Sequence, residues 1–442
     1  MYQQLINLKD ALGTHPSLKY VISQSHWETD FLRFYQSQTN YNISKEKHSL
    51  HCQLYKDKRS FGFEVDNPDE KKVMHALEDA LKIIDKMPAD PDFVDVEDDA
   101  RLAEPRPFTN NIQRIGLKEK TEILQSLAKS VAPHRFELFG TFICNNSRSR
   151  FMNSNGLDKD SQGSPIYFEV KAVNKENQVT VLETFGGENF DFFDIEAMRE
   201  SLLFKIENAK KPVVDVDAGK YELILAPRCV AEFVQYLSYG MNAAALDRHS
   251  SYFEGLKDTQ VFPEIISITD DPKDPQMVQA SYGDGGSLYE ELKLIDKGYF
   301  RAFTCGKYYH HKTGEPKNGN TAECLKIAPG EHSLEEMIAS IKHGLYISSL
   351  HYMNFINMRD TSLTGLTRDG TFLIEDGKIT KVVNNLRFTE HISEILKNAT
   401  ALENKVYTIP FSSNYNMFDI NTSKAPHAKI KEFFISSSTK TI

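Results

Sequence analysis

Helical spacing of apolar side chains distinguishes residues 226–255 from the rest of the sequence. Pro227 suits the first turn of a helix, where its missing N–H group is not needed. Apolar positions then recur on one face at the spacing of an α-helix, which predicts a helix that reaches Ala245. These positions are Val230, Phe233, Val234, Leu237, Met241, Ala244 and Ala245. An Arg-His-Ser-Ser turn follows at 248–251.

The N-terminal part alternates polar residues with aromatic or branched ones over 18–65, a pattern that predicts strands. We expect the next helix to begin with Asn67 as its cap, Pro68 in its first turn and the acid Glu70 at its third position. Its buried stripe is predicted to be Val73, Leu77, Ala80, Leu81 and Ile84.

Residues 88–112 form an acidic, Pro-rich stretch with few large apolar side chains, which indicates a surface linker. Amphipathic patterns predict helices over 117–131 and 194–209. Between these helices, the segments 136–146 and 164–174 alternate as strands do.

Turn-forming residues near 210–220 mark the expected domain boundary. Lys210-Lys211-Pro212 is followed by Asp217-Ala218-Gly219, a hairpin signal. We therefore expect an N-terminal mixed α/β domain over 1–215 and a C-terminal β-rich domain over 216–442. The fold class is α+β.

Three signals place further elements in the second domain. Ser333-Leu334-Glu335-Glu336 is a capping box, and Gly344 is predicted to close that helix as a left-handed cap. Asp376-Gly377 between two apolar runs predicts a hairpin turn.

Composition narrows the class of protein. The chain has 442 residues, enough for two domains, and a formal net charge of −10. Because it contains no long Lys/Arg block, a nucleic-acid partner is not expected. No run of about eighteen apolar residues is present, so a membrane partner is not expected either. Five scattered cysteines without a C-x-x-C pair indicate buried thiols in a reducing, cytoplasmic compartment.

The segment 226–255 resembles the metal-binding helix of the TldD/PmbA family, also called modulators of DNA gyrase. Its metal-binding branch carries His-Glu-x-x-x-His ahead of an Arg-x-x-Ser-Ser turn. Counted back from Arg248, those three places hold Gln235, Tyr236 and Gly240. A hydrolytic zinc site needs imidazole, thiolate or carboxylate ligands and a base beside the metal-bound water. Glutamine is a poor ligand, tyrosine is a poor base and glycine has no side chain, a pattern typical of the metal-free PmbA/TldE branch.

The order of turns through the second half extends the resemblance. Matching segments are Phe262-Pro263, Asp270-Asp271-Pro272, Gly298-Tyr299-Phe300, Lys312-Thr313-Gly314, Gly319-Asn320, Pro329-Gly330-Glu331, Gly344–Ile347, Thr364-Gly365 and Phe372–Gly377. In the first half, Asn153-Ser154-Asn155-Gly156 is similar to a family turn. Metal-binding members also use a Cys ligand near the C-terminus, and Asn414–Ile442 contains no cysteine.

The resemblance implies a PmbA/TldE-like subunit of an intracellular TldD/TldE-type metalloprotease complex that acts on unfolded or short peptides. In this interpretation the chain carries no cofactor and no catalytic residue, and zinc is bound only by a TldD-like partner. Members of the family form dimers, so the partner is a TldD-like subunit or a second copy. The chain would dock the catalytic subunit, complete an enclosed chamber and help to hold extended peptide.

Three other hypotheses stay open. The main alternative is a stand-alone homodimeric peptide-binding or scaffold protein without catalysis. A metal-independent hydrolase would use Cys229, but the sequence offers no histidine partner at a recognisable offset, so a buried structural cysteine is favoured. Regulation of DNA topology rests on the family's older name alone, and the acidic balance weighs against it.

Several further residues have side chains that could bind a ligand or take part in catalysis. Arg248, Ser250 and Ser251 are the cleft candidates, with a structural salt bridge as the equal alternative for Arg248. The pairs His310-His311 and His48/His51 are expected on strands and interpreted as solvated or hydrogen-bonded, because no third metal ligand is evident. Further segments, interpreted as a turn and a mobile surface loop, are Asp270–Asp274 and Gly283–Gly286.

Overall fold

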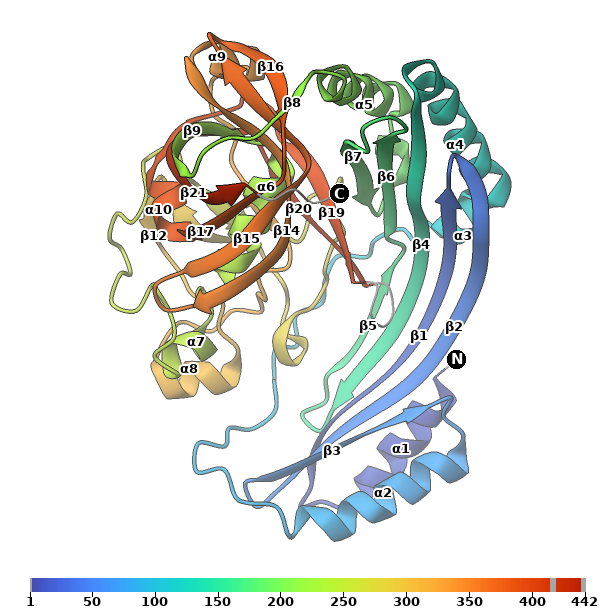
Figure 1. Ribbon diagram of the computed structural model, residues 1–442. Helices are drawn as coiled ribbons and strands as arrows, with labels where there is room; N and C mark the ends of the chain where they lie inside the picture. Colours follow the sequence, from blue (N-terminus) through green and yellow to red (C-terminus); the bar gives the residue numbers. More distant parts are fainter. Residues whose placement is uncertain (1, 414–418, 439–442) are drawn as a thin grey trace.

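The computed structural model describes residues 2–413 and 419–438. These residues form three β-sheets and ten α-helices, which are joined by turns and loops. One long sheet stands beside a β-rich lobe, with helices on the outer face of the sheet and inside the lobe (Figure 1). The molecule is therefore a mixed α+β protein, as the sequence predicts.

The first sheet has the strand order β3-β2-β1-β4-β6-β7, with β5 paired to β4. All its neighbours are antiparallel. Its strands are β1 (Lys19–Tyr35), β2 (Gln38–Lys56), β3 (Arg59–Asp66), β4 (Phe136–Asn153), β5 (Asp158–Gly163), β6 (Ile166–Asn174) and β7 (Thr180–Gly187).

Two groups of helices cover opposite ends of the first sheet (Figure 1). The pair α1 (Gln3–Gly13) and α2 (Glu70–Ile84) packs on one end. The other end carries α3 (Asn111–Arg114), α4 (Leu117–Val131) and α5 (Ile195–Ala209), with short 3-10 turns η1 (Ala132–His134) and η2 (Phe190–Phe192).

A small barrel forms the centre of the second lobe. Its strands follow the order β14-β9-β21-β17-β15, and β14 also pairs with β15, which closes the ring. The barrel sheet comprises β8 (Val213–Val214), β9 (Gly219–Leu225), β14 (His343–Asn357), β15 (Ser362–Glu375), β16 (Lys378–Val383), β17 (Leu386–His391), β18 (Ala399–Leu402) and β21 (Ala428–Ser438).

A third sheet packs against the barrel lobe in the order β12-β11-β10-β13-β20-β19. Its strands are β10 (Ile268–Asp270), β11 (Leu292–Asp296), β12 (Tyr299–Phe300), β13 (Leu325–Ile327), β19 (Tyr407–Ser413) and β20 (Asp419–Ala425). The remaining helices are α6 (Pro227–Ser238), α7 (Ala243–Asp247), α8 (Lys307–Thr313), α9 (Leu334–Ala339) and α10 (Ile392–Lys397), with the 3-10 turn η3 (Asp284–Gly286).

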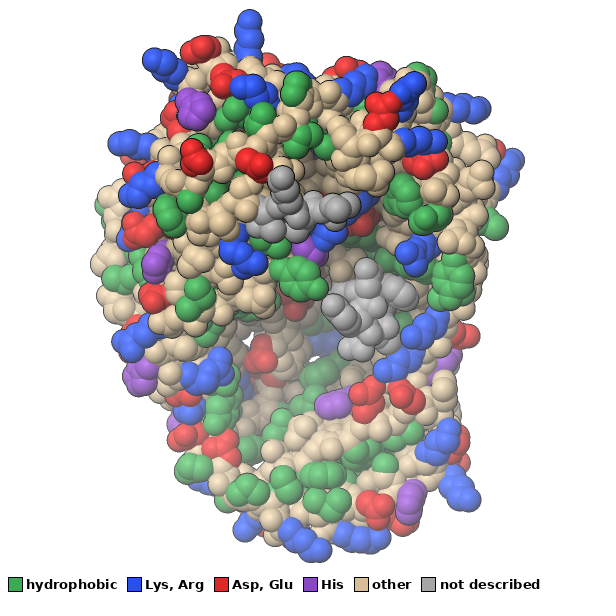
Figure 2. All heavy atoms as spheres, in the orientation of Figure 1, with side chains coloured by type: hydrophobic (Ala, Val, Ile, Leu, Met, Phe, Trp, Pro, Cys, Tyr) green, Lys and Arg blue, Asp and Glu red, His purple; other side chains and the backbone are tan. Residues whose placement is uncertain are grey.

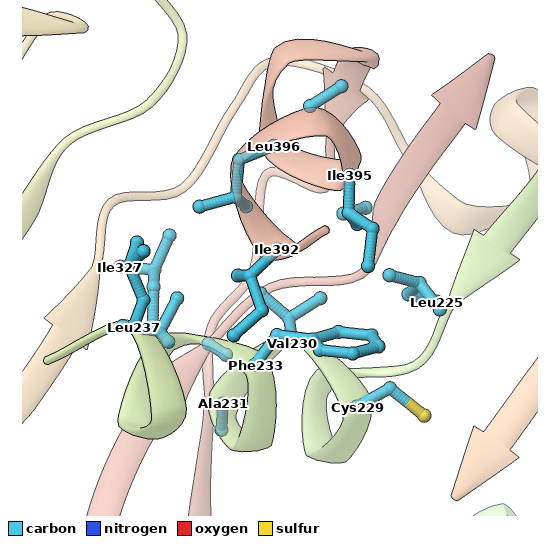
Figure 3. Packing of buried hydrophobic residues seen from close by; sticks show 14 of the residues in the cluster. Leu225, Cys229, Val230, Ala231, Phe233, Leu237, Ile327, Ile392, Ile395 and Leu396 are labelled. Carbon is cyan, nitrogen blue, oxygen red and sulfur yellow. The ribbon is translucent and has the colours of Figure 1, made fainter. Parts of the chain in front are cut away.

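The core of this lobe is built around α6. Val230 and Phe233 of α6 face Ile392 and Ile395 of α10 (Figure 3). The Phe233 ring also contacts Phe388 edge-on, with ring centres 6.0 Å apart. Because all these side chains are buried, α6 is held as a fixed element between the barrel and the third sheet.

Several sequence predictions are confirmed. The helices over 117–131 and 194–209 appear as α4 and α5. Ser333 and Glu336 form the predicted capping box at the start of α9. The turn between β15 and β16 is Asp376-Gly377, with φ angles of 46° and 75° that suit a primed hairpin turn.

Two turns in the N-terminal strands were not predicted. Gln36-Ser37 joins β1 to β2 and Asp57-Lys58 joins β2 to β3, each with two positive φ angles. Neither pair contains the glycine that usually marks such a turn, so the alternating pattern ran through them unbroken. The cap of α2 is also two residues later than predicted: Asp69, not Asn67, accepts the N–H of Lys72.

Three predictions in the second lobe are wrong. Gly344 lies inside β14 rather than at a helix end. The position requires glycine because a Cβ there would come within 2.2 Å of the Glu222 carbonyl oxygen on β9. Residues 217–219 make no hairpin, since β8 pairs with β16 and β9 pairs with β14 and β21. The apolar face that begins on α6 continues through Met241 onto α7, a separate helix capped by Asn242.

The acidic stretch 88–112 ties the two lobes together. Glu97 is buried, accepts hydrogen bonds from Ser287 and Lys317, and has a pKa lowered to about 2 because these bonds outweigh its burial. Arg106, also in this stretch, donates a hydrogen bond to the side-chain oxygen of Gln279 in the second lobe. The stretch therefore holds the first sheet against the loops of the second lobe. The domain boundary at residue 215 stays a prediction.

Candidate functional site

The helix α6 begins where a strand of the barrel ends. Ala226 has extended backbone angles and donates its N–H to the carbonyl oxygen of Ile347 on β14, which anchors the first turn. Pro227 occupies the first helical position, as predicted. One face of α6 is buried in the core, and the other carries half-buried polar side chains, namely Arg228, Glu232, Gln235 and Tyr236.

The three degenerate metal-helix positions are engaged in hydrogen bonds or close packing. Gln235 donates from Nε2 to the Ser423 hydroxyl at 3.3 Å, and the Tyr236 hydroxyl donates to the Met353 carbonyl oxygen at 2.6 Å. Gly240 lies past the end of α6, is buried, and accepts a hydrogen bond from the Ser251 hydroxyl at 2.6 Å. In this arrangement Gln235 and Tyr236 join α6 to β20 and β14.

Metal-type donors do not gather at α6. Over residues 2–413 and 419–438, the one group of three His, Cys, Asp or Glu side chains with converging ligand atoms is on β1 and β2, and none of its members belongs to α6. An amide oxygen, a phenol and a glycine do not supply the donor set of a hydrolytic zinc site. Part of the predicted cysteine-free tail, 414–418 and 439–442, lies outside the described residues.

The three cleft candidates beyond α7 have different environments. Arg248 is exposed on the surface. The Ser250 hydroxyl donates to the Ala245 carbonyl oxygen at 3.2 Å. The buried Ser251 hydroxyl donates to Gly240 and accepts the N–H of Phe253 at 3.0 Å. Both serines thus fix the turn after α7, and the structure leaves their role as cleft residues a prediction.

An ion pair that sequence reasoning missed lies on the polar face of α6. Arg228 Nε is 3.2 Å from a carboxylate oxygen of Glu232, one helical turn later. Burial raises the pKa of Glu232 to about 7, although Arg228 opposes the shift. The spacing of the pair was visible in the sequence, but not its burial by β19 and β20.

Replacement of Glu232 tests this burial. Because the folded-state pKa lies above the ordinary value of 4.5, the folded protein holds a proton that the unfolded chain has lost between those values. The contribution of Glu232 to stability is therefore greatest below pH 4.5 and falls as pH rises through 7. Relative to Glu232→Gln, the wild type should lose on the order of 3 kcal/mol of unfolding free energy between pH 4.5 and 8.

Urea denaturation at several pH values measures this difference. Glu264→Gln, at an exposed position in the same lobe, is the control and should follow the wild type at every pH. Parallel pH profiles for the wild type and Glu232→Gln would contradict the assignment.

A cleft of about 410 Å³ opens beside the first turn of α6. It is lined by parts of β7, α5, α6, β14 and β19, so both lobes contribute to it. Figure 2 shows the face of the molecule hollowed between the two lobes. Strands β7 and β19 are the last strands of their sheets, and both lie along the cleft.

Polar side chains in the cleft are held by an ion pair and by hydrogen bonds. Lys205 Nζ is 2.6 Å from a carboxylate oxygen of Glu183, and His427 Nδ1 is 2.6 Å from Glu403. The other ring nitrogen of His427 is 3.1 Å from the Tyr346 hydroxyl. Burial lowers the pKa of His427, and although burial alone would raise that of Glu403, hydrogen bonds from His427 and Tyr407 lower it. No local pattern joins these residues in the sequence.

Other predicted chemical groups are structural or differently placed. Cys229 is buried, as expected, and burial raises the pKa of its thiol well above the ordinary value. All five cysteines are buried and free. His310 and His311 lie on the helix α8, so the prediction of a strand there is wrong.

The acidic turn and the glycine loop are also structural. Asp270, the first residue of the predicted turn, ends strand β10, and its carboxylate accepts the Tyr289 hydroxyl at 2.7 Å. The carboxylate of Asp274 pairs with Lys424 at 2.7 Å. The loop at 283–286 packs inward rather than lying fully on the surface, because buried Gly286 accepts a hydrogen bond from Lys159 at 2.8 Å.

Comparison with known proteins decides the family. Residues 218–437 match the sequence model described as the PmbA/TldA metallopeptidase C-terminal domain. The chain belongs to the PmbA/TldD metallopeptidase family. No curated protein matches the chain significantly. The family match covers α6 and nearly all of the barrel sheet, and leaves out β8 and the last residue of β21.

Solved structures extend the likeness to the first sheet. TldE from Thermococcus kodakarensis superposes with a TM-score of 0.85 at 19% identity over 98% of this chain and 100% of that one. A proposed modulator of DNA gyrase from Thermotoga maritima gives 0.83 at 17% identity over 98% and 100%. Another from Bacteroides thetaiotaomicron gives 0.81 at 15% identity over 99% and 100%. The chain thus has the TldE-like fold throughout. Among its described residues, no helix is long and apolar enough to cross a membrane.

Proposed function

We propose that this chain is the subunit without the catalytic zinc in an intracellular TldD/TldE-type peptidase complex. The observation that carries the proposal is which side chains stand at the metal-ligand positions on and just after α6. At the places where the family's metal-binding branch has His, Glu and His, this chain has Gln235, Tyr236 and Gly240, and the first two side chains hydrogen-bond to β20 and β14. Hydrolysis would then depend on a TldD-like partner that holds the zinc.

Extended peptide is the proposed substrate class, and the edge strands support it. Strand β7 is bonded on one side only, to β6, and β19 on one side only, to β20, within the described sheets. Both line the cleft at the start of α6. Strand edges that pair with no further strand can bind an extended chain through main-chain hydrogen bonds with little dependence on its sequence.

Enclosure explains a preference for unfolded or short peptides. The cleft lies between two lobes, and a partner placed over the hollow in Figure 2 would close it further. A folded domain is too wide to enter such a space, whereas a single extended strand is not.

Complex formation provides the test. The chain is mixed with the TldD-like protein of its own organism, and the mass of the product is measured by size-exclusion chromatography with light scattering. We expect a hetero-oligomer with one chain of each kind at its core. A homodimer that binds peptide and ignores the TldD-like protein would favour the stand-alone scaffold instead.

A further inference from the structure

Two histidines and a glutamate meet on the first sheet, far from α6 in the sequence. His26 of β1 lies directly opposite His48 of β2, and Glu46 lies two residues before His48 on the same face. The Nε2 atoms of His26 and His48 are 2.7 Å and 2.9 Å from the same carboxylate oxygen of Glu46. The two imidazole rings stack with centres 4.1 Å apart.

These side chains lie between the two groups of helices that cover the sheet. Gln24, two residues before His26, accepts the N–H of Leu5 on α1. Asp30, two residues after Glu28, pairs with Lys120 of α4. Since alternate residues share a face, His26 lies on this face between the two helix contacts.

The donor set suits a transition metal. All three ligand atoms lie within 4.8 Å of one another. Zinc with bonds of about 2.1 Å holds tetrahedral ligand atoms about 3.4 Å apart. The two stacked rings must tilt toward each other for their in-plane lone pairs to converge on one ion. Two imidazoles and one carboxylate are a donor set that zinc accepts, with a fourth position for water.

We propose that His26, His48 and Glu46 form a zinc-binding site that clips β1 to β2. Each imidazole gives the lone pair of Nε2 to the metal and keeps its proton on Nδ1, so binding needs both rings neutral. The site is separate from α6 and does not rest on the proposed function. Its role is to join the strands where the sheet carries no helix.

Neighbouring charges act in both directions. Glu28 lies opposite Glu46 on the same face and accepts a hydrogen bond from Asn146 at 3.2 Å. Arg148 faces His26 from β4, and its guanidinium lies over the Phe108 ring, 4.5 Å from the centre. The Glu28 carboxylate favours a bound cation and the Arg148 guanidinium opposes one. Among metals, the two imidazole ligands favour zinc and its transition-metal neighbours over magnesium or calcium.

The only tryptophan of the chain provides a local probe. Trp27 follows His26 directly on β1, and its fluorescence is quenched by a Co²⁺ ion bound beside it. Titration of the full-length protein with Co²⁺ should give saturable quenching at one equivalent. Addition of Zn²⁺ should then restore the emission as it displaces cobalt.

Three variants decide the assignment. His48→Gln and Glu46→Gln should each weaken Co²⁺ binding at least about tenfold, because even outer-shell partners of metal sites matter that much. His51→Gln is the matched control, since it lies on the same strand with its side chain on the opposite face, and it should bind as the wild type does. Circular dichroism confirms that each variant is folded. Unsaturable quenching of the wild type, or equal affinity in Glu46→Gln, would overturn the proposal.

Discussion

Replacing Lys120 with methionine is expected to lower the free energy of unfolding by about 3–5 kcal/mol. The Lys120 side chain is 0% exposed, and its Nζ lies 2.5 Å from a carboxylate oxygen of Asp30 on β1. Methionine keeps much of the length of the side chain but leaves the Asp30 carboxylate buried without its cation. An unpaired buried charge costs far more than a lost surface ion pair.

The same helix supplies the control. Lys118 lies two residues earlier and its side chain is 80% exposed, so Lys118→Met should change stability by no more than about 0.5 kcal/mol. Lys120→Met combined with Asp30→Leu removes both charges and should recover most of the loss. Urea denaturation measures all three variants. Equal midpoints for Lys120→Met and Lys118→Met would show that the pair does not hold α4 on the sheet.

The sequence contained a signal that Lys120 is buried, but the charge of a lysine side chain favours the opposite assignment. Position 120 continues the buried stripe of α4 backwards by one turn from Leu124, so the helical spacing alone places it inside. A lysine is normally assigned to the solvated face, and only the position of Asp30 on β1 explains why this one is buried. A helix pattern predicts which face is covered but not which partner covers it.

The elements with strong local rules were predictable, and those set by distant contacts were not. The capping box at Ser333 and the turn at Asp376-Gly377 depend on neighbours in the chain. Gly344 was misplaced because the reason for a glycine there is the passage of β9 beside it. The match of His26 with His48 depends on a turn at Gln36-Ser37 that has no sequence marker.

In the candidate site, too, features set by the local sequence were predictable and features set by distant contacts were not. The proposed loss of the metal ligands rests on Gln235, Tyr236 and Gly240 alone, by comparison with the family's motif. The cleft beside α6 could not be predicted, because its lining comes from Glu183, Lys205, Tyr346 and His427, which no local pattern connects. Lys205 pairs with Glu183 inside the first lobe and His427 with Glu403 inside the second, and the cleft forms only where the two lobes meet.

Peptide hydrolysis should show the largest functional effect, because the proposed role assigns all of the chemistry to the partner. The cleft of this chain holds paired carboxylates and a buried histidine, and among residues 2–413 and 419–438 the one converging group of three metal-type donors lies away from α6. Zinc added to the chain alone should therefore produce no cleavage. Zinc at the β1–β2 site would not change this result, since that site is on the helix-covered face of the first sheet.

The decisive measurement is cleavage of an unstructured peptide by four samples in the presence of zinc: this chain, its TldD-like partner, the two together, and the two together with the glutamate of the partner's His-Glu-x-x-x-His changed to glutamine. The account predicts no cleavage by this chain, full activity in the unaltered pair, and a loss of about 10²–10⁴-fold when the partner's general base is removed. Zinc-dependent cleavage by this chain alone, undiminished in the altered pair, would contradict it.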